Sequence, residues 1–281
     1  MTDLQSQLFA DGFIFLEAPR WHQGHLWVPD VFGQKLYKLD QSGAKTVVVE
    51  SLPPRPNSIG FLPDGTLLIV SSVKRQILKL VDENLLTYAD LSQDAAGDLN
   101  DFAIDQTGRV YIGNYGYDLF GGAPKQETCV HLVERDGAIR VAATGLEFPN
   151  GTVIINGGRT LIVAETWRGH LTAFDVASDG SLSNKRNFAN LEGREPDGIC
   201  ADAAGGIWVP SFNTGEVLRV VEGGEVTHRI QFPGSAIACQ LGGEDGRTLF
   251  CSTYAGSVPD QLAKKPYGAL HAVRVDVPRP S

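Results

Sequence analysis

Long apolar runs are missing from this 281-residue chain, and no stretch approaches the roughly 18 apolar residues of a membrane-spanning helix. The N-terminal stretch MTDLQSQLFADG has no basic segment followed by an apolar one, so we expect no secretory signal peptide. The chain has four cysteines and no CxxC pair: Cys129, Cys200, Cys239 and Cys251. Apolar surroundings at three of them favour buried free thiols, so we expect a cytoplasmic protein that does not enter a membrane.

Excess positive charge is also missing, because the formal net charge is -9. An acidic chain has no general electrostatic attraction to nucleic acid or to an anionic membrane, so neither is an expected partner. Several catalytic signatures are absent as well: the sequence contains no GxSxG, no HExxH and no Walker loop. The apolar and charged fractions, 42% and 20%, are ordinary for a folded globular protein.

Sustained helical periodicity is absent, whereas the 32 glycines and 15 prolines suit short strands joined by turns. Six similar apolar runs recur at a spacing of about 40 to 50 residues. They are HLWVPD from His25, GTLLIVSS from Gly65, GRVYIGN from Gly108, RTLIVAE from Arg159, GGIWVPS from Gly205 and RTLFCST from Arg247. Each is followed by a second strand-like piece, for example His131–Gly137 and His170–Val176. This repeat length is typical of one β-propeller blade.

The six repeats predict an all-β protein, a six-bladed β-propeller with four antiparallel strands per blade, and a single domain over residues 1–281. We expect the N-terminal stretch LFADGFIFLE to add a strand to the last blade and so close the ring. The longest repeat contains Gly113–Thr128, whose composition predicts a long loop at the rim of a pocket.

A polar residue stands at the entrance of another short apolar segment in each repeat, about ten residues before each of the six runs. These residues are Glu17, Asn57, Asn100 with Asp101, Asn150, Asp197 and Ser235. Equivalent positions in six blades form one ring at one end of the central channel. Asn, Asp and Ser also suit turns for structural reasons alone, but Glu17 is a poor turn residue.

Such a ring brings carboxylate and amide oxygens together, and these are the ligands that hard divalent cations prefer. Without a cation, Glu17 and Asp197 would repel each other. We therefore expect one bound divalent cation, with Ca²⁺ as the first choice and Mn²⁺, Mg²⁺, Zn²⁺ or Fe²⁺ as alternatives that an oxygen ring also accepts.

Four stretches together carry a family resemblance: EAPRWHQGHLWVPD, LNDFAIDQTGRVYIGN, FPNGTVIINGGRTLIVAET and PDGICADAAGGIWVPSFNTGEVLRV. From about Glu17 to Ala255 the chain resembles the senescence-marker-protein, gluconolactonase and luciferin-regenerating-enzyme family. The resemblance implies a propeller with a divalent cation at the top of the channel, bound by Glu17, Asn150 and Asp197. It also places Asn100 where relatives contact substrate or metal.

Members of this family open lactones, commonly sugar lactones, so the resemblance implies a hydrolase acting on a lactone or ester. Sugar-lactone members often carry an arginine just upstream of the Asn100 position, and here Leu99 stands there. This departure favours a less polar lactone. Leu99, Tyr115, Phe148 and Trp167 are expected near the mouth of the channel, with packing between blades as the alternative for Phe148. Substrate contacts are expected from Asn57, Asn100, Asp118, Tyr115 and Trp167.

Lactone hydrolysis needs a base that accepts a proton from water, and Asp197 or Asp101 are the candidates. Asp101 is alternatively a structural, hydrogen-bonded residue, and strand alternation leaves open whether Asn100 and Asp101 both face the channel. None of the six histidines occupies a ring position. The alternative functions are a non-catalytic cation-binding or scaffold propeller and, less favoured, a condensing enzyme related to strictosidine synthase. The sequence makes no prediction of oligomeric state.

Overall fold

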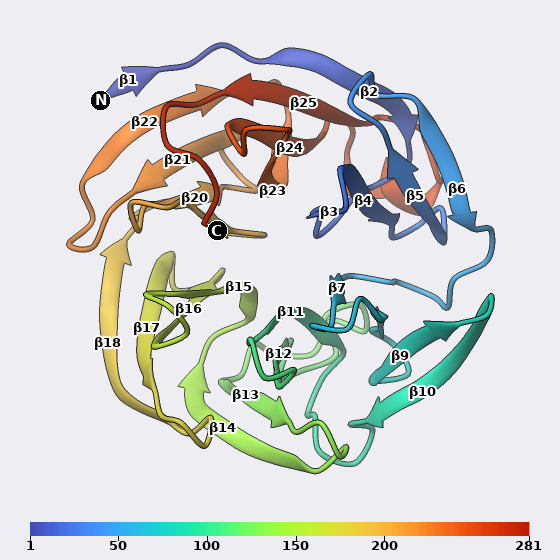
Figure 1. The fold of residues 1–281 in the computed structure, drawn as a ribbon, viewed down its shortest axis with the longest axis vertical. Coiled ribbons are helices and arrows are strands. Elements are labelled where there is room, and N and C mark those ends of the chain that lie inside the picture. Colours follow the sequence, from blue (N-terminus) through green and yellow to red (C-terminus); the bar gives the residue numbers. More distant parts are fainter. Residues whose placement is uncertain (281) are drawn as a thin grey trace.

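The computed structural model describes residues 1–280 and shows six small sheets arranged around a central axis (Figure 1). The first three sheets contain β3 (Arg20–His22), β4 (His25–Asp30), β5 (Lys35–Leu39) and β6 (Lys45–Val49); β7 (Ile59–Phe61), β8 (Leu67–Ser71), β9 (Gln76–Val81) and β10 (Asn84–Asp90); and β11 (Leu99–Ile104), β12 (Val110–Asn114), β13 (Thr128–Val133) and β14 (Ile139–Leu146).

The other three sheets complete the ring and include both strands of the N-terminal segment. They contain β15 (Pro149–Ile155), β16 (Thr160–Glu165), β17 (His170–Val176) and β18 (Leu182–Asn190); β19 (Cys200–Ala201), β20 (Ile207–Pro210), β21 (Glu216–Val220), β22 (Val226–Gln231) and β1 (Thr2–Asp3); and β23 (Ser235–Gly242), β24 (Thr248–Tyr254), β25 (Gly268–Arg274) and β2 (Gln7–Phe13). The predicted six-bladed propeller is confirmed.

The six apolar runs of the sequence form β4, β8, β12, β16, β20 and β24, the second strand of each blade. One predicted strand is displaced, because the piece expected at His131–Gly137 begins at Thr128 and ends at Val133. Blade five also differs from the four-strand pattern. There β1 pairs in parallel with β22, with Thr2 opposite His228, and adds a fifth strand.

Ring closure follows the prediction, because β2 pairs antiparallel with β25 as the outer strand of blade six (Figure 1). Phe13 at the end of β2 is fully buried, and its ring meets the ring of Tyr37 from blade one edge-on at 5.1 Å. The N-terminal segment therefore links the last blade to the first.

The hydrophobic core lies mainly between neighbouring blades. Ile162 and Leu171 of blade four, for example, belong to the same buried cluster as Val209 and Leu218 of blade five. One short helix, α1 (Val258–Leu262), lies in the connection between β24 and β25. Within residues 1–280, no helix has the length and apolar character needed to cross a membrane.

The first strands of the blades line the centre and contact one another around it (Figure 1). The Gly151 amide donates to the Asp197 carbonyl at 3.2 Å, and the Gly198 amide donates to the Ile237 carbonyl at 2.9 Å. A β-carbon at Gly151 would lie 2.3 Å from the Asp197 carbonyl oxygen, so only glycine allows this approach. Three consecutive blades are thus joined by their backbones beside the ring of polar residues.

Candidate metal and active site

The predicted ring residues stand at the same end of the six inner strands. Asn100 and Asp101 lie in β11 and Asn150 lies in β15, whereas Glu17 and Asp197 shortly precede β3 and β19. All five are buried except Glu17, which is partly exposed. The structure therefore brings the expected ligands Glu17, Asn150 and Asp197 to one end of the channel.

β-bulges interrupt strict alternation at the ring positions of β11 and β15. The register of β11 against β12 shifts between Leu99 and Phe102, the interval that contains Asn100 and Asp101. In β15 a corresponding shift surrounds Asn150. An extra residue in a strand suspends strict alternation, so neighbouring side chains can lie on the same side. Asn100 and Asp101 are both buried, with partners from other blades.

The ring asparagines share one orientation. Asn57 Nδ2 donates to Tyr115 Oη at 2.6 Å, Asn100 Nδ2 donates to the Pro149 carbonyl at 3.2 Å, and Asn150 Nδ2 donates to Thr166 Oγ1 at 3.2 Å. Each amide nitrogen is thus used by the protein. The oxygen is the atom of each amide that these bonds leave for another ligand.

The carboxylates at this end of the channel are mutually repulsive. Although the residue as a whole is partly exposed, burial of its carboxyl group raises the pKa of Glu17 well above its usual range, and the charges of Asp197 and Asp101 add to the effect. Burial, with a contribution from the Asp101 charge, raises the pKa of Asp197 to about 8. Asp197 Oδ1 is moreover buried without any hydrogen-bond partner. A buried carboxylate oxygen of this kind is costly unless something compensates it.

These residues fit a hard divalent cation. Two carboxylates, one with an unpartnered oxygen, and amide oxygens from adjoining blades form an all-oxygen donor set. Within residues 1–280, no three His, Cys, Asp or Glu side chains are grouped to hold a metal by themselves. A metal at this position therefore requires the Asn150 amide in addition to Glu17 and Asp197.

Asp101 accepts hydrogen bonds from residues that no sequence pattern indicated. Arg20 Nη2 lies 2.6 Å from Asp101 Oδ1, and Ser58 Oγ and the Phe102 amide donate to the same oxygen. The only signal for Arg20 was a single charge within the inner-strand motif EAPRW. Its partner is 81 residues away in sequence, so no local pattern points to the pair.

Backbone strain occurs beside three ring positions. Ala18, Arg55 and Phe148 have φ angles of 37°, 54° and 54°, values uncommon for residues other than glycine. Each directly precedes a proline, in a motif that also contains a ring residue. Strain of this kind persists only where surrounding structure enforces it, and it occurs often at functional sites.

The aromatic residues form one cluster, from the long loop and the following blade. Tyr115 stacks on Phe148 with centroids 4.5 Å apart, and Phe148 contacts Trp167 at 4.9 Å. Tyr115 and Phe148 are buried and Trp167 is partly exposed. Leu99 is fully buried in the core between blades two and three, so it does not line the mouth as a substrate contact.

Asp118 differs from the ring residues because it is exposed. Its Oδ1 accepts a hydrogen bond from the Gly121 amide at 2.8 Å within the same loop. The predicted loop itself is present and connects β12 to β13.

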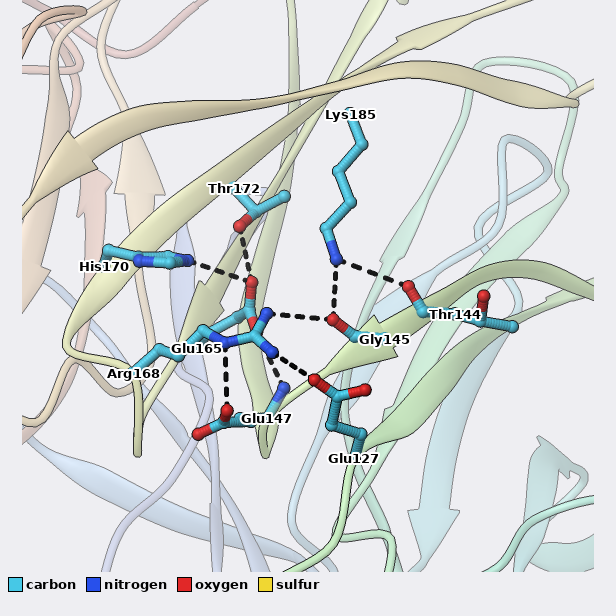
Figure 2. Close-up of polar contacts among 9 residues, drawn as sticks. All are labelled: Glu127, Thr144, Gly145, Glu147, Glu165, Arg168, His170, Thr172 and Lys185. Carbon is cyan, nitrogen blue, oxygen red and sulfur yellow. Dashed lines mark hydrogen bonds and ion pairs between the residues drawn. The ribbon is translucent and has the colours of Figure 1, made fainter.

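Arg168 is the centre of an ion-pair network, drawn in Figure 2, whose members include sequence neighbours of the aromatic residues. Arg168, which follows Trp167, contacts Glu165 Oε2 at 3.1 Å and Glu147 Oε1 at 3.0 Å, and also pairs with Glu127 at the end of the long loop. Glu147 directly precedes Phe148. The network thereby fixes the bases of both aromatic side chains and the end of the long loop.

Glu165 is the buried centre of this network. Its Oε1 accepts hydrogen bonds from Thr172 at 2.5 Å and from His170 at 3.2 Å (Figure 2). Although burial acts in the opposite direction, hydrogen bonds from His170, Thr172 and the Glu147 amide, with the Arg168 charge, lower the pKa of Glu165. His170 therefore has a structural contact outside the ring.

A cavity of about 290 Å³ lies farther along the channel than the ring residues. Its lining includes Ile104, Ile154 and Ala201, which come after the ring positions along their strands. Arg20 also lines it. Arg20 therefore contacts both this cavity and Asp101.

Comparison with known proteins gives relatives that cover most of the chain. Regucalcin from Danio rerio is 27% identical over 265 residues, covering 89% of this chain and 86% of the relative. The 6-deoxy-6-sulfogluconolactonase of Pseudomonas putida is 26% identical over 281 residues, covering 93% and 91%. A crystal structure of a calcium-binding protein, regucalcin, from Agrobacterium tumefaciens has the same fold, with a TM-score of 0.82 at 19% identity and coverage of 99% and 96%.

The family model for the SMP-30/gluconolactonase/LRE-like region matches residues 15–255. The match extends over all the ring positions and most of the propeller. It agrees with the resemblance noted in the four sequence stretches. The chain belongs to the SMP-30/gluconolactonase/LRE-like family.

Proposed function

We propose that this protein is a divalent-metal-dependent hydrolase that opens a lactone. The observation that carries the proposal is the convergence of Glu17, Asn150 and Asp197 from three blades, with Asp197 Oδ1 buried and unpartnered. A scaffold propeller has no need for this costly arrangement. Membership of a family with lactonase relatives supports the same reaction class.

Glu17, Asn150 and Asp197 would hold the cation, with Ca²⁺ as the first choice because all the donors are oxygens. When bound, such a cation supplies Lewis-acid polarisation of the ester carbonyl and lowers the pKa of a coordinated water. Asn100 and Asn57, whose amide nitrogens are bonded within the protein, would contact the substrate through their amide oxygens.

A base must take the proton from the attacking water. Asp197 is the better candidate, because Asp101 Oδ1 already accepts from Arg20, Ser58 and the Phe102 amide. The tetrahedral carbon then expels the ring oxygen as the ester C–O bond breaks, the proton taken up by Asp197 passes to that oxygen, and the product is a hydroxy acid. Each of these steps takes place at a buried end of the channel, where charge interactions are strong.

We further propose that the substrate is less polar than a sugar lactone. Trp167 is partly exposed beside the stacked Tyr115 and Phe148, so one face near the ring is aromatic. Position 99 holds a leucine buried in the core, so no polar side chain reaches the substrate from there.

The test is a pH-indicator assay over sugar lactones, unsubstituted lactones and simple esters, with chelator-treated protein before and after cation is added back. We expect hydrolysis of at least one lactone only after the cation is restored, with lower KM for the less polar lactones. If the protein binds Ca²⁺ but hydrolyses nothing on the panel, the non-catalytic cation-binding alternative is favoured instead.

A further inference from the structure

Arg20 places a positive charge inside the channel at the level just beneath the ring. It extends from β3 of blade one, and its Nη2 reaches Asp101 Oδ1 at 2.6 Å and the Phe102 carbonyl at 3.3 Å in blade three. Its Nη1 donates to the Pro19 carbonyl at 3.1 Å. The guanidinium is therefore held by the Pro19 carbonyl beside it in the chain and by Asp101 and the Phe102 carbonyl in blade three.

Blade two, which lies between them, contributes Ser58. Its hydroxyl is fully buried and donates to the same Asp101 oxygen, and Arg20 Nη2 lies 3.5 Å from Ser58 Oγ. Side chains from blades one and two thus converge on Asp101 Oδ1 of blade three, which also accepts from the Phe102 amide. A carboxylate oxygen that accepts several hydrogen bonds, one of them from a charged arginine, is fixed in position. It is not free to turn toward another cation.

The position matters because Asp101 is the third carboxylate at this end of the channel, after Glu17 and Asp197. A site open to all three would carry three negative charges. Because Arg20 is paired with Asp101, only the charges of Glu17 and Asp197 remain uncompensated.

We propose that Arg20 is a positioning residue that neutralises Asp101 and keeps it out of the cation's ligand set. This inference rests on the proposed metal site and adds which carboxylates take part in it. Asp101 then serves as the anchor that holds Arg20 across the floor of the site, with the cavity of about 290 Å³ on the other side.

Removing the Arg20 charge while keeping its bulk is the first part of the test. Calorimetric titration of chelator-treated Arg20→Met with Ca²⁺ should show binding roughly tenfold to a hundredfold tighter than wild type, because a third carboxylate loses its counter-charge. Arg20→Gln, which keeps a hydrogen-bond donor for Asp101 but no charge, should also bind more tightly and serves if Arg20→Met does not fold. The matched control is Arg274→Met, which removes the same charge from an exposed pair with Asp245.

The double variant Arg20→Met/Asp101→Asn separates neutralisation from direct ligation. If Arg20 only cancels Asp101, removing both should return the Ca²⁺ affinity to within about threefold of wild type, whereas Asp101→Asn alone should weaken it about tenfold or more by leaving Arg20 unpaired. Unchanged or weaker binding by both neutral Arg20 variants would overturn the proposal, and so would a double variant as weak as Asp101→Asn. Wild-type protein that binds no Ca²⁺ overturns the metal site as well, which distinguishes the two failures.

Discussion

Thr166 determines how the Asn150 amide is oriented, and it does so through two hydrogen bonds. Its Oγ1 accepts from Asn150 Nδ2 at 3.2 Å and donates to the Pro196 carbonyl at 2.8 Å, next to Asp197. One hydroxyl therefore connects two expected metal ligands from adjoining blades. Hydrogen-bonded supports of this kind fix the orientation of a metal ligand.

Thr166→Val keeps the shape of this residue and removes both hydrogen bonds. We expect Ca²⁺ affinity to fall by about tenfold to a hundredfold, the usual cost of losing an outer support of a metal ligand. Calorimetry measures it, with Thr160→Val as control, because Thr160 is buried in the same blade but bonds Asn156. Equal effects of the two variants would show that Thr166 has no special role.

A second prediction at the residue scale concerns Glu165 and the pH dependence of stability. Because its pKa is lowered in the folded protein, its charge stabilises the fold above the pKa of the unfolded state, and this contribution is lost as the pH falls through the lower folded value. The free energy of unfolding should therefore decline below pH about 4.5.

Glu165→Gln removes this titration and should cost about 1 to 3 kcal/mol at pH 7, because buried donors lose a charged partner. Urea unfolding between pH 3 and pH 7 measures both effects. The acid-dependent decline should be shallower in Glu165→Gln than in wild type, and parallel pH profiles would assign it to other carboxylates.

At the scale of single elements, the packing of β15 against the turn before β19 sets the distance between Asn150 and Asp197. Gly151→Ala would place a methyl group 2.3 Å from the Asp197 carbonyl oxygen and from the Ile199 nitrogen. Both are backbone atoms, which cannot move aside as a flexible side chain would.

We expect Gly151→Ala to reduce the free energy of unfolding by about 1 to 3 kcal/mol, as overpacking does, and to weaken Ca²⁺ binding. Gly205→Ala is the control: it has a φ of 76° and no atom within 4 Å, so it has a backbone cost without a clash. Thermal unfolding and calorimetry with both variants decide the matter. If Gly205→Ala also weakened Ca²⁺ binding, strand packing beside the ring would not be the cause.

At the scale of the whole molecule, stability depends on how the ring is closed. Phe13 is fully buried at the junction of blades six and one, whereas Leu8 on the same strand is 60% exposed. Phe13→Ala should cost about 3 to 5 kcal/mol and Leu8→Ala less than about 0.5 kcal/mol. Chemical denaturation measures both, and similar small losses would mean that closure by β2 contributes little.

The sequence predicted the blade count because the strand repeat recurs six times, and it predicted the closing strand from the strand-like N-terminal stretch. The same repeat indicated which polar residues stand at the entrances of the inner strands. It could not predict the Arg20–Asp101 pair, whose members are 81 residues apart on different blades. The bulge at Asn100 and Asp101 departs from the alternation rule that sequence reading relies on. The pairing of β1 with β22 involves two residues, too few for a periodic pattern.

Metal-dependent lactone opening has one most direct test. Wild-type protein and Asp197→Asn are stripped with a chelator, and the initial rate of lactone opening is followed with a pH indicator before and after cation is restored. We predict that wild-type activity disappears on stripping and returns with the cation, whereas Asp197→Asn stays inactive in both states. Full activity of Asp197→Asn after the cation is restored, or wild-type activity that survives complete stripping, would contradict the proposed function.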